Sequence, residues 1–192
     1  KKVIQEDFSS IDGEDYLVFA SLLNATKYGV PQLRERVFFI GLRKSALKVK
    51  ALRDLQVKED QSKFYPFPHE THYIGDQPKT SSLPAVTSGD VLLDLDEPMS
   101  ATDLSQKHYS KAARLPKSQG QIEIDLTKPS ITIRANHHGN IEFRRLQNGK
   151  NANELKANKP QRRLTIRECA RLQTFPDDYM FVIRKEGTKH RY

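Results

Sequence analysis

Three side chains with planar hydrogen-bond donors alternate near the start of the chain, at Gln32, Arg34 and Arg36. On an extended strand, alternate side chains project from one face, so these three would line one side of it. A guanidinium group is always charged and presents a fork of N–H donors that suits a phosphate or a ring carbonyl oxygen. The apolar run from Val37 to Ile40 predicts a buried strand. The arginines would lie at the end of this strand, and open α/β sheets bind ligands at strand ends. A solvated, polar start to the strand is the alternative.

The only cysteine, Cys169, is a second candidate for chemistry. It directly follows a capping box from Thr165 to Glu168, in which the hydroxyl and the carboxylate each bind a backbone amide at the start of a helix. This helix should run to about Gln173 or Thr174, because a Phe-Pro pair follows. At an apolar position of the helix, Cys169 is predicted to be a small buried hydrophobe rather than a nucleophile with a lowered thiol pKa.

The cysteine and histidine content limits the other sites that the chain can form. A single cysteine excludes an internal disulfide framework and a four-cysteine zinc site. The six histidines include no helical pair at metal-ligand spacing with a carboxylate partner, so we predict no metal.

The net charge of +8 is distributed unevenly, since residues 121–192 contain 15 Lys and Arg against 8 Asp and Glu. Clustered cations release counterions from nucleic acid, so a phosphate-facing surface is one interpretation and an ordinary solvated face is the other. No run approaches the roughly twenty apolar residues of a membrane span, and the start has no apolar signal-peptide core. We therefore expect a cytoplasmic protein. The missing initial Met suggests a trimmed or internal fragment.

The spacing of apolar residues predicts a mixture of strands and helices around a partial core. Strands are expected at residues 37–40, 121–126, 130–134 and 141–143, with a turn near 127–129, and residues 14–23 should be a strand or a short helix. Residues 44–64 are expected to be helical or exposed, and helices are expected at 91–95 and, with weak periodicity, over 101–120. Residues 65–84 read as an extended connection and 147–162 as a polar loop.

Two long segments resemble conserved motifs of one enzyme family. Residues 23–41, LNATKYGVPQLRERVFFIG, resemble the eighth motif of the DNA cytosine carbon-5 methyltransferases, and residues 163–177, RLTIRECARLQTFPD, resemble the ninth. The order of the motifs and the variable stretch of about 120 residues between them also match that family. The resemblance implies an α/β fold, with the terminal part of a Rossmann-like methyltransferase domain that depends on S-adenosylmethionine and a small mixed α+β target recognition domain.

The same resemblance divides the chain into three parts. Residues 1–48 would form the end of the catalytic domain and residues 49–162 a linker with the target recognition domain. Residues 163–192 would carry the ninth-motif helix and the start of the return to the catalytic domain.

Single residues receive roles from the resemblance. Arg34 and Arg36 match the arginines that hold a flipped target nucleotide, one at the cytosine carbonyl oxygen and one at its phosphate. The Thr132-Ile133 pair is similar to an element that precedes a base-contacting loop. Arg114 and Lys117 lie in a stretch that could be a recognition loop or a solvated helix face. The DNA-binding candidates are Gln32, Arg114, Lys117, Thr132, Arg134, Asn136, His137 and His138. Arg163, Thr165, Arg167, Glu168 and Arg171 match the ninth motif and should pack under the recognition domain and organise it.

Other motifs of the family are missing from this sequence. It has no Pro-Cys-Gln nucleophile motif, no Gly-rich loop for S-adenosylmethionine, no Glu-Asn-Val motif and no closing Gly-Asn-Ser/Ala-Val motif. We therefore expect the carboxy-terminal, target-recognising part of a DNA cytosine-5 methyltransferase, inactive alone, with S-adenosylmethionine bound by the missing part. Expected partners are double-stranded DNA, the remainder of the methyltransferase and a cognate restriction endonuclease, near the nucleoid of a bacterial cell. The alternatives are a natural DNA-binding subunit or silent homologue that needs a partner chain, and a stand-alone basic domain.

Overall fold

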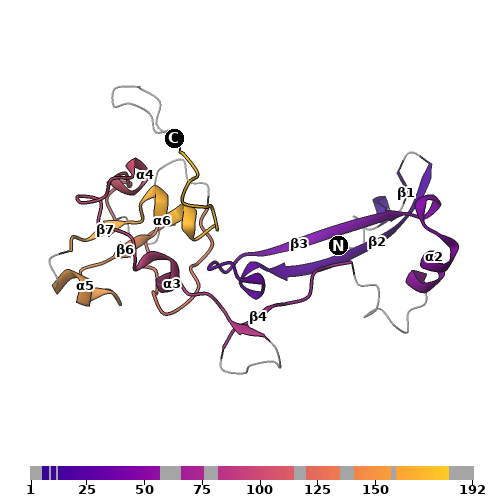
Figure 1. The fold of residues 1–192 in the computed structure, drawn as a ribbon, viewed down its shortest axis with the longest axis horizontal. Coiled ribbons are helices and arrows are strands. Elements are labelled where there is room, and N and C mark those ends of the chain that lie inside the picture. Colours follow the sequence, from indigo (N-terminus) through magenta and orange to yellow (C-terminus); the bar gives the residue numbers. More distant parts are fainter. Residues whose placement is uncertain are drawn as a thin grey trace. The chain divides into compact units, whose positions relative to one another are not determined.

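A computed structural model of the chain describes residues 6–8, 10–11, 13–56, 66–75, 82–114, 120–134, 141–156 and 159–181. The chain forms two compact units, both drawn in Figure 1. The first, called the hairpin unit, comprises residues 1–24 and 35–70, and the second, called the core unit, comprises residues 25–34 and 71–192. None of the helices in the described ranges combines the length and the apolar character that crossing a membrane requires. The functional boundaries predicted at residues 48 and 162 do not coincide with this division and stay predictions.

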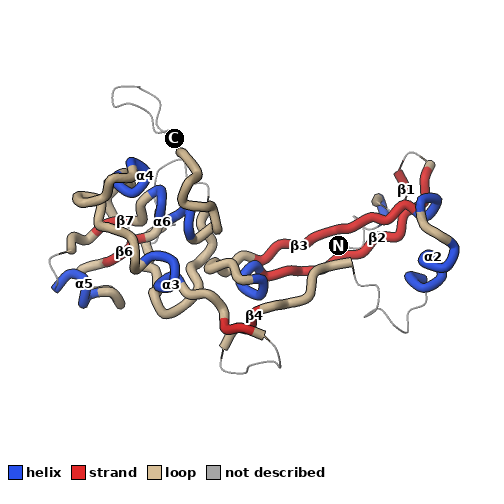
Figure 2. The backbone as a smooth tube through the Cα atoms, in the orientation of Figure 1, coloured by secondary structure: helices blue, strands red, loops and turns tan. Residues whose placement is uncertain are grey.

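The hairpin unit is built on two long antiparallel strands, β2 (Glu14–Asn24) and β3 (Glu35–Arg43). The short strand β1 (Ser10–Ile11) pairs with the other edge of β2. A 3-10 turn, η2 (Lys44–Ala46), and the helix α2 (Val49–Gln56) follow β3. Figure 2 shows these strands in red and the helical segments in blue. The strand predicted at residues 37–40 is confirmed, and the stretch from residue 14 is a strand rather than a helix. Of the range 44–64, residues 49–56 are helical, and residues 57–64 lie outside the described residues.

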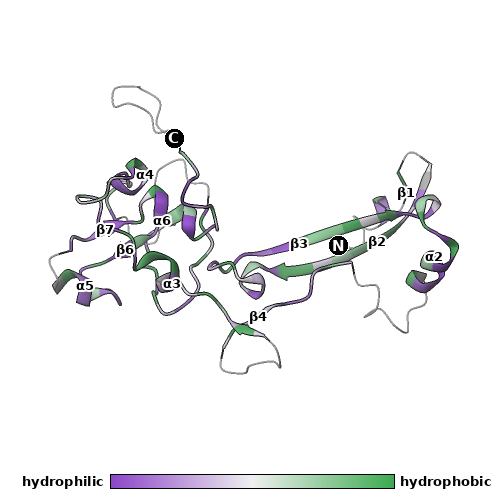
Figure 3. Cartoon of the chain, in the orientation of Figure 1, coloured by the Kyte–Doolittle hydropathy of each residue, from purple (hydrophilic) through white to green (hydrophobic). Residues whose placement is uncertain are grey.

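The strand β3 is not buried, although its apolar sequence predicts that it should be. Val37 is 46% exposed and Phe38 is 49% exposed. Neighbouring residues of a strand project from opposite faces, so apolar side chains are exposed on both faces of the sheet. Leu22, which pairs with Val37, is also exposed, and Figure 3 shows the hydrophobic colour along both strands. The prediction of burial is wrong because the described residues of the hairpin unit provide too little structure to cover this sheet.

The core unit contains short elements joined by irregular stretches. Its helices are η1 (Ala25–Tyr28), α3 (Ser88–Leu92), α4 (Leu104–Lys107), α5 (Ala152–Lys156) and α6 (Ile166–Arg171). Its described residues form two pairs of strands, parallel β4 (His72–Tyr73) with β5 (Leu83–Pro84) and antiparallel β6 (Phe143–Arg145) with β7 (Arg162–Arg163). The mixture of helices and strands agrees with the predicted α/β class.

The hydrophobic core of this unit collects side chains that lie far apart in the sequence. Its buried members are Leu92, Ile124, Ile133, Leu164 and Leu172, with Val91, Leu95, Leu126, Ile141 and Cys169 packed against them. Because Leu164 precedes α6 and Leu172 follows it, the helix is held in the core at both of its ends.

The helix α6 begins as its sequence predicts. Thr165 Oγ1 accepts a hydrogen bond from the Glu168 amide at 3.0 Å, and the Thr165 amide donates to Glu168 Oε2 at 2.9 Å. The predicted capping box is therefore confirmed. The helix ends at Arg171, earlier than predicted, because Thr174 adopts a left-handed conformation with φ 63° and the Phe175 amide turns back to the Ala170 carbonyl.

Two predicted strands, at residues 121–126 and 130–134, are wrong. In the described part of the chain these stretches form only isolated bridges, at Glu123 and Ser130. The alternation in the sequence reflects burial of Ile124 and Ile133 in the core and not a hydrogen-bonded ladder. The Asn151 side-chain amide donates to the Ile124 carbonyl at 2.9 Å, which replaces the bond that a neighbouring strand would make.

The helix and loop predictions for the core unit are confirmed only in part. α3 begins before the predicted residues 91–95 because Thr87 and Asp90 form a second capping box. Of the range 101–120 only α4 is helical among the described residues, since His108 bonds to Ile166 and the next residue bridges to the start of α6. The range 147–162 contains α5 and β7 rather than a loop alone, and the strand predicted at 141–143 begins at Phe143.

Candidate functional site

The segment that precedes Arg34 is joined to residues 130–132 by backbone hydrogen bonds. The Leu33 amide donates to the Ser130 carbonyl at 2.7 Å, and the Ser130 amide donates to the Pro31 carbonyl at 2.9 Å. The Thr132 hydroxyl adds a third bond to the Leu33 carbonyl at 2.5 Å. These bonds connect two of the sequence regions predicted to contact DNA within one compact unit.

The turn before this junction explains why the donors at 32, 34 and 36 do not share a strand face. Gln32 is 1% exposed, its amide donates to the Val30 carbonyl and its side chain reaches the Leu172 carbonyl at 3.5 Å. The strand begins only at Glu35, because the residues before it bond to other segments. The one-face prediction is therefore wrong. Gln32 occupies an interior position, with its Oε1 buried and without a hydrogen-bond partner, and its predicted contact with DNA has no support in this geometry.

Glycine is required at one position of the same turn for two reasons. Gly29 has a φ of 83°, a left-handed conformation that side chains other than glycine rarely adopt. A Cβ atom there would also lie 2.9 Å from the ring of His72, which belongs to β4. The turn that leads to Arg34 is thus fixed against β4 as well as against residues 130–132.

The two predicted pocket arginines have different surroundings. Arg34 is half-buried in the core unit, and its carbonyl accepts a hydrogen bond from the Ala25 amide at 3.0 Å. Arg36 is exposed in the hairpin unit, and its Nη1 donates to the Glu35 carbonyl at 2.6 Å. Both guanidinium groups keep donors for a ligand, and their roles in a nucleotide pocket stay predictions.

A pocket of about 350 Å³ lies beside the junction at Leu33. It combines apolar walls with one cation and one carboxylate, and its lining residues are Leu33, Gly120, Ile122, Ile131, Thr132, Arg134 and Glu142. Arg134 is exposed, whereas Glu142 is 7% exposed. Burial raises the pKa of the Glu142 carboxyl, and its own backbone amide, Arg134 and Arg163 offset this only in part. The pocket offers a bound group one charged donor, Arg134, and one carboxyl, Glu142.

Of the remaining DNA-binding candidates, the structure describes only one. Arg114 is exposed at the end of a described stretch, while Lys117, Asn136, His137 and His138 lie outside the described residues. Arg163 fixes the chain just before Arg114, because its Nε donates to the Ala112 carbonyl at 3.1 Å and its Nη2 to the Ala113 carbonyl at 3.2 Å. The same guanidinium stacks on the ring of Phe143.

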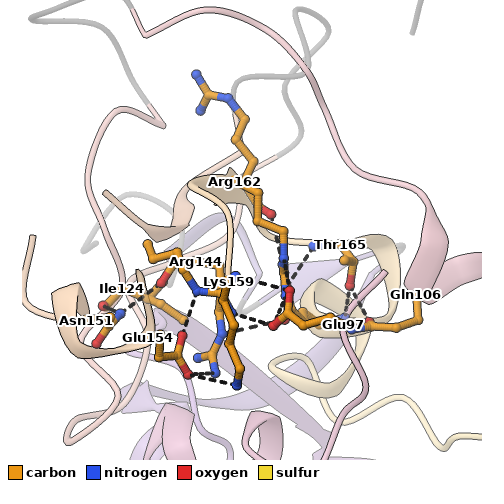
Figure 4. Close-up of polar contacts among 12 residues, drawn as sticks. Glu97, Gln106, Ile124, Arg144, Asn151, Glu154, Lys159, Arg162 and Thr165 are labelled. Carbon is orange, nitrogen blue, oxygen red and sulfur yellow. Dashed lines mark hydrogen bonds and ion pairs between the residues drawn. The ribbon is translucent and has the colours of Figure 1, made fainter. Parts of the chain in front are cut away.

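A buried network of ion pairs supports these segments, and Figure 4 shows much of it. Glu97 binds Arg145 Nη2 at 2.5 Å and Arg162 Nε at 3.1 Å. Arg162 also binds Glu168 at 2.7 Å, and Arg145 binds Glu154 at 2.8 Å. Burial alone would raise the pKa of Glu97, but hydrogen bonds and charge from the two arginines lower it to about 2. The network ties β6 and β7 to the start of α6. Only Glu168 was predicted from the sequence as part of such a structure.

The other ninth-motif residues also bind protein groups. Thr165 donates from its hydroxyl to Gln106 Oε1 at 2.6 Å. Arg167 binds Asp103 at 2.7 Å, and Arg171 binds both Asp94 and Asp177. Arg163, Thr165, Arg167 and Glu168 are buried and Arg171 is half-buried. These contacts join α6 to α3, to α4 and to the chain that follows, which supports the predicted organising role.

Cys169 lines an apolar pocket of about 540 Å³ and packs against the hydrophobic core. Burial raises the pKa of its thiol well above the usual range, and the carboxylates of Glu168 and Glu142 act in the same direction. Because the thiolate is the nucleophilic form of cysteine, this environment disfavours the reactive form of Cys169. Within the described residues, no group of three or more His, Cys, Asp or Glu is placed to hold a metal ion.

Comparison with known proteins gives a family match over the whole chain. The model of the C-5 cytosine-specific DNA methylase family matches residues 1–192. Type II methyltransferase M.BsuRI of Bacillus subtilis is 32% identical, over 93% of this chain and 36% of its own length. M.MthTI of Methanothermobacter thermautotrophicus is 28% identical, over 88% of this chain and 48% of its own. M.FnuDI of Fusobacterium nucleatum is 29% identical, over 94% and 51%. The chain therefore spans about half or less of the length of these relatives.

Proposed function

This chain belongs to the C-5 cytosine-specific DNA methylase family, and we propose that it is the carboxy-terminal, target-recognising portion of a DNA cytosine-5 methyltransferase. The full-length enzyme would transfer a methyl group from S-adenosylmethionine to carbon 5 of a cytosine flipped out of double-stranded DNA. The observation that carries this proposal is the junction of Leu33 with Ser130 and Thr132, since it joins the segment before Arg34 to the stretch before Arg134.

The proposed division of labour takes the role of each residue from the family resemblance. Arg34 and Arg36 hold the flipped nucleotide, one at the cytosine carbonyl oxygen and the other at the phosphate, because a guanidinium group supplies charged, forked donors to either. Thr132, Arg134 and Arg114 contact the DNA around it. Arg134 and Arg114 are exposed and carry the positive charge that a phosphate backbone attracts.

The ninth-motif residues act as positioning residues in this proposal. Arg163 holds the backbone before Arg114, and the Leu164 amide donates to the Glu142 carbonyl at 2.9 Å. The segment just before α6 thereby supports two stretches that line the proposed DNA surface. A change in these residues would affect DNA recognition through the position of other side chains.

Covalent chemistry is not assigned to this chain. The unreactive environment of Cys169 supports the view that the attack on carbon 6 needs a cysteine from the remainder of the methyltransferase. S-adenosylmethionine supplies the methyl group when it is bound by that remainder. We expect the 192-residue chain, mixed with S-adenosylmethionine and DNA, to transfer no methyl group. Transfer by the pure chain would contradict the assignment of Cys169.

The pocket roles are tested by Arg34→Ala and Arg36→Ala in the full-length protein. Each should reduce the single-turnover rate of methyl transfer about 100-fold, a typical loss when one charge-stabilising donor is removed. The variant that loses the phosphate contact should also reduce the slope of log affinity against log salt by about one. Arg53→Ala in α2 is the matched control, because Arg53 is exposed and lies outside the proposed site. Unchanged rates in both pocket variants would remove these arginines from the site.

The names of the relatives suggest a restriction-modification context, since each is called a Type II methyltransferase. We extend this to the present protein as part of the proposal, with a restriction endonuclease of the same target sequence as its functional partner. Plasmid DNA methylated by the full-length protein should resist that endonuclease and remain sensitive to nucleases with other targets.

A further inference from the structure

The carboxylate of Glu142 is buried without a partner side chain in the described part of the chain. It forms no ion pair and accepts no hydrogen bond from any other described residue, and it faces the pocket beside Leu33. Arg163 is close enough to influence it, but the donors of Arg163 bind backbone carbonyls, including those of Gly120 and Ile141, and the side chain of Gln121. The guanidinium of Arg163 is therefore already satisfied by other acceptors.

Other buried carboxylates of the core unit are compensated. Glu97, Glu154 and Glu168 each bind arginine side chains of the network described above. A buried carboxylate without a partner costs stability, so its presence in a pocket points to a group that it binds. Glu142 differs from the network in the one respect that matters for a ligand, since it lines an open pocket and has no arginine of the described residues bound to it.

Arg134 supplies the second polar group of that pocket. It is exposed, and its charge acts on Glu142, so the two side chains lie near each other. Ile122 and Ile131 form apolar walls beside them. Apolar walls exclude water and strengthen the hydrogen bonds that a bound group would make.

The two groups match the major-groove edge of a G·C base pair. A carboxylate accepts a hydrogen bond from the N4 amino group of cytosine, and an arginine fork binds O6 and N7 of guanine. Adenine fits less well, because its N7 acceptor stands beside its amino group and would face the carboxylate. We infer that Arg134 and Glu142 read one G·C base pair of the target sequence, with Glu142 on the cytosine amino group and Arg134 on the paired guanine. This inference rests on the proposed function.

The test uses the full-length protein and a pool of duplexes in which each position of its target is varied in turn. Glu142→Gln should reduce the preference for cytosine over adenine at one position about 10- to 100-fold, because glutamine binds adenine through both N6 and N7. The preference at the other positions should remain. Arg134→Ala should weaken the preference at the same base pair, and the double variant should lose little more than either single one. Asp178→Asn, an exposed change on the same unit, is the matched control.

The outcomes separate this inference from the proposed function. If the unaltered protein methylates no cytosine, the proposed function fails. If it methylates a defined target and the folded Glu142→Gln variant keeps the same preference at every position, the reading role of Glu142 is excluded. If Arg134→Ala and Glu142→Gln alter different base pairs, their joint reading of one pair is overturned. Should Glu142→Gln fail to fold, Glu142→Asp provides the same comparison, since it keeps the charge but withdraws the carboxylate by one methylene.

Discussion

The two compact units differ in the kinds of side chain that they bury. The hairpin unit leaves apolar side chains such as Leu22, Val37 and Phe38 about half exposed. The core unit instead buries charged side chains, including Arg145 and Arg163, which are 0% and 1% exposed. The difference teaches that polarity in the sequence does not by itself locate the interior of this protein.

The physical basis of the difference lies in where each unit finds partners. The arginines of the core unit meet carboxylates and backbone carbonyls within the same unit, so their charges are compensated there. The apolar residues of β2 and β3 lie on both faces of one sheet, a pattern typical of sheets covered on both sides. Under the proposed function, the remainder of the methyltransferase supplies those layers.

The largest loss of stability is expected when one partner of a buried ion pair in the core unit is removed. Glu168→Ala leaves Arg162 without a main partner and removes half of the α6 capping box. We expect the free energy of unfolding to fall by about 3–5 kcal/mol, because an uncompensated charge then stays buried. Urea denaturation measures this loss, with Asp178→Ala as the exposed control. A loss below about 1 kcal/mol would contradict a stabilising role for the network.

Acid should weaken the same network through Glu97. The pKa of Glu97 is lowered from 4.5 to about 2, so the stabilisation that its ionised form provides is present above about pH 4.5 and is lost as the pH falls towards about 2. After a discount for partial exposure, the effect should be about 2 kcal/mol. Glu97→Gln should lose this part of the pH dependence, and parallel curves for the two proteins would contradict the prediction.

Glu142 should show the opposite dependence on pH, because its pKa is raised. A raised pKa in the folded state means that stability is highest when the carboxyl is protonated and falls as the pH rises through the folded pKa. Glu142→Gln should therefore stabilise the protein near neutral pH by up to about 1 kcal/mol, and the gain should vanish in acid. Thermal unfolding at several pH values measures it. A variant that is less stable at every pH would show that Glu142 has a stabilising partner.

The smallest effect is expected at the exposed sheet. Val37→Thr, which preserves shape, should change the stability of the 192-residue chain by less than about 0.5 kcal/mol, as surface substitutions usually do. In the full-length protein the same change should cost about 1–2 kcal/mol if another layer covers this face. Chemical denaturation of both forms gives the comparison. Equal costs would mean that Val37 has the same environment in both.

The sequence predicted features that depend on neighbouring residues better than features that depend on distant ones. The α6 capping box needs only Thr165 and Glu168, and it forms as expected. The strand at Ile124 was predicted wrongly because a side chain 27 positions away, Asn151, binds its carbonyl. The interior position of Gln32 could not be predicted either, because it depends on the bonds that its neighbours Pro31 and Leu33 make to Ser130 across the fold.

The ion-pair network shows a similar limit. Paired arginines at 144–145 and 162–163 are visible in the sequence, but clustered charge usually indicates a solvated face. Their burial follows from carboxylates at Glu97 and Glu154, and the sequence gives no sign of that pairing. Of the predicted site, the ninth-motif contacts and the neighbourhood of Thr132 and Leu33 have direct geometric support. The predicted base-contacting loop extends beyond the described residues.

The junction at Leu33 has a consequence for how such proteins diversify. Two of its three bonds use only backbone atoms of Pro31, Leu33 and Ser130, so they do not depend on which side chains flank them. Neighbouring positions in the proposed recognition segment can therefore mutate, and a segment from a relative could be transplanted, without loss of these two bonds. New target preferences could then evolve in the segment around residues 130–132 while the turn before Arg34 keeps its shape.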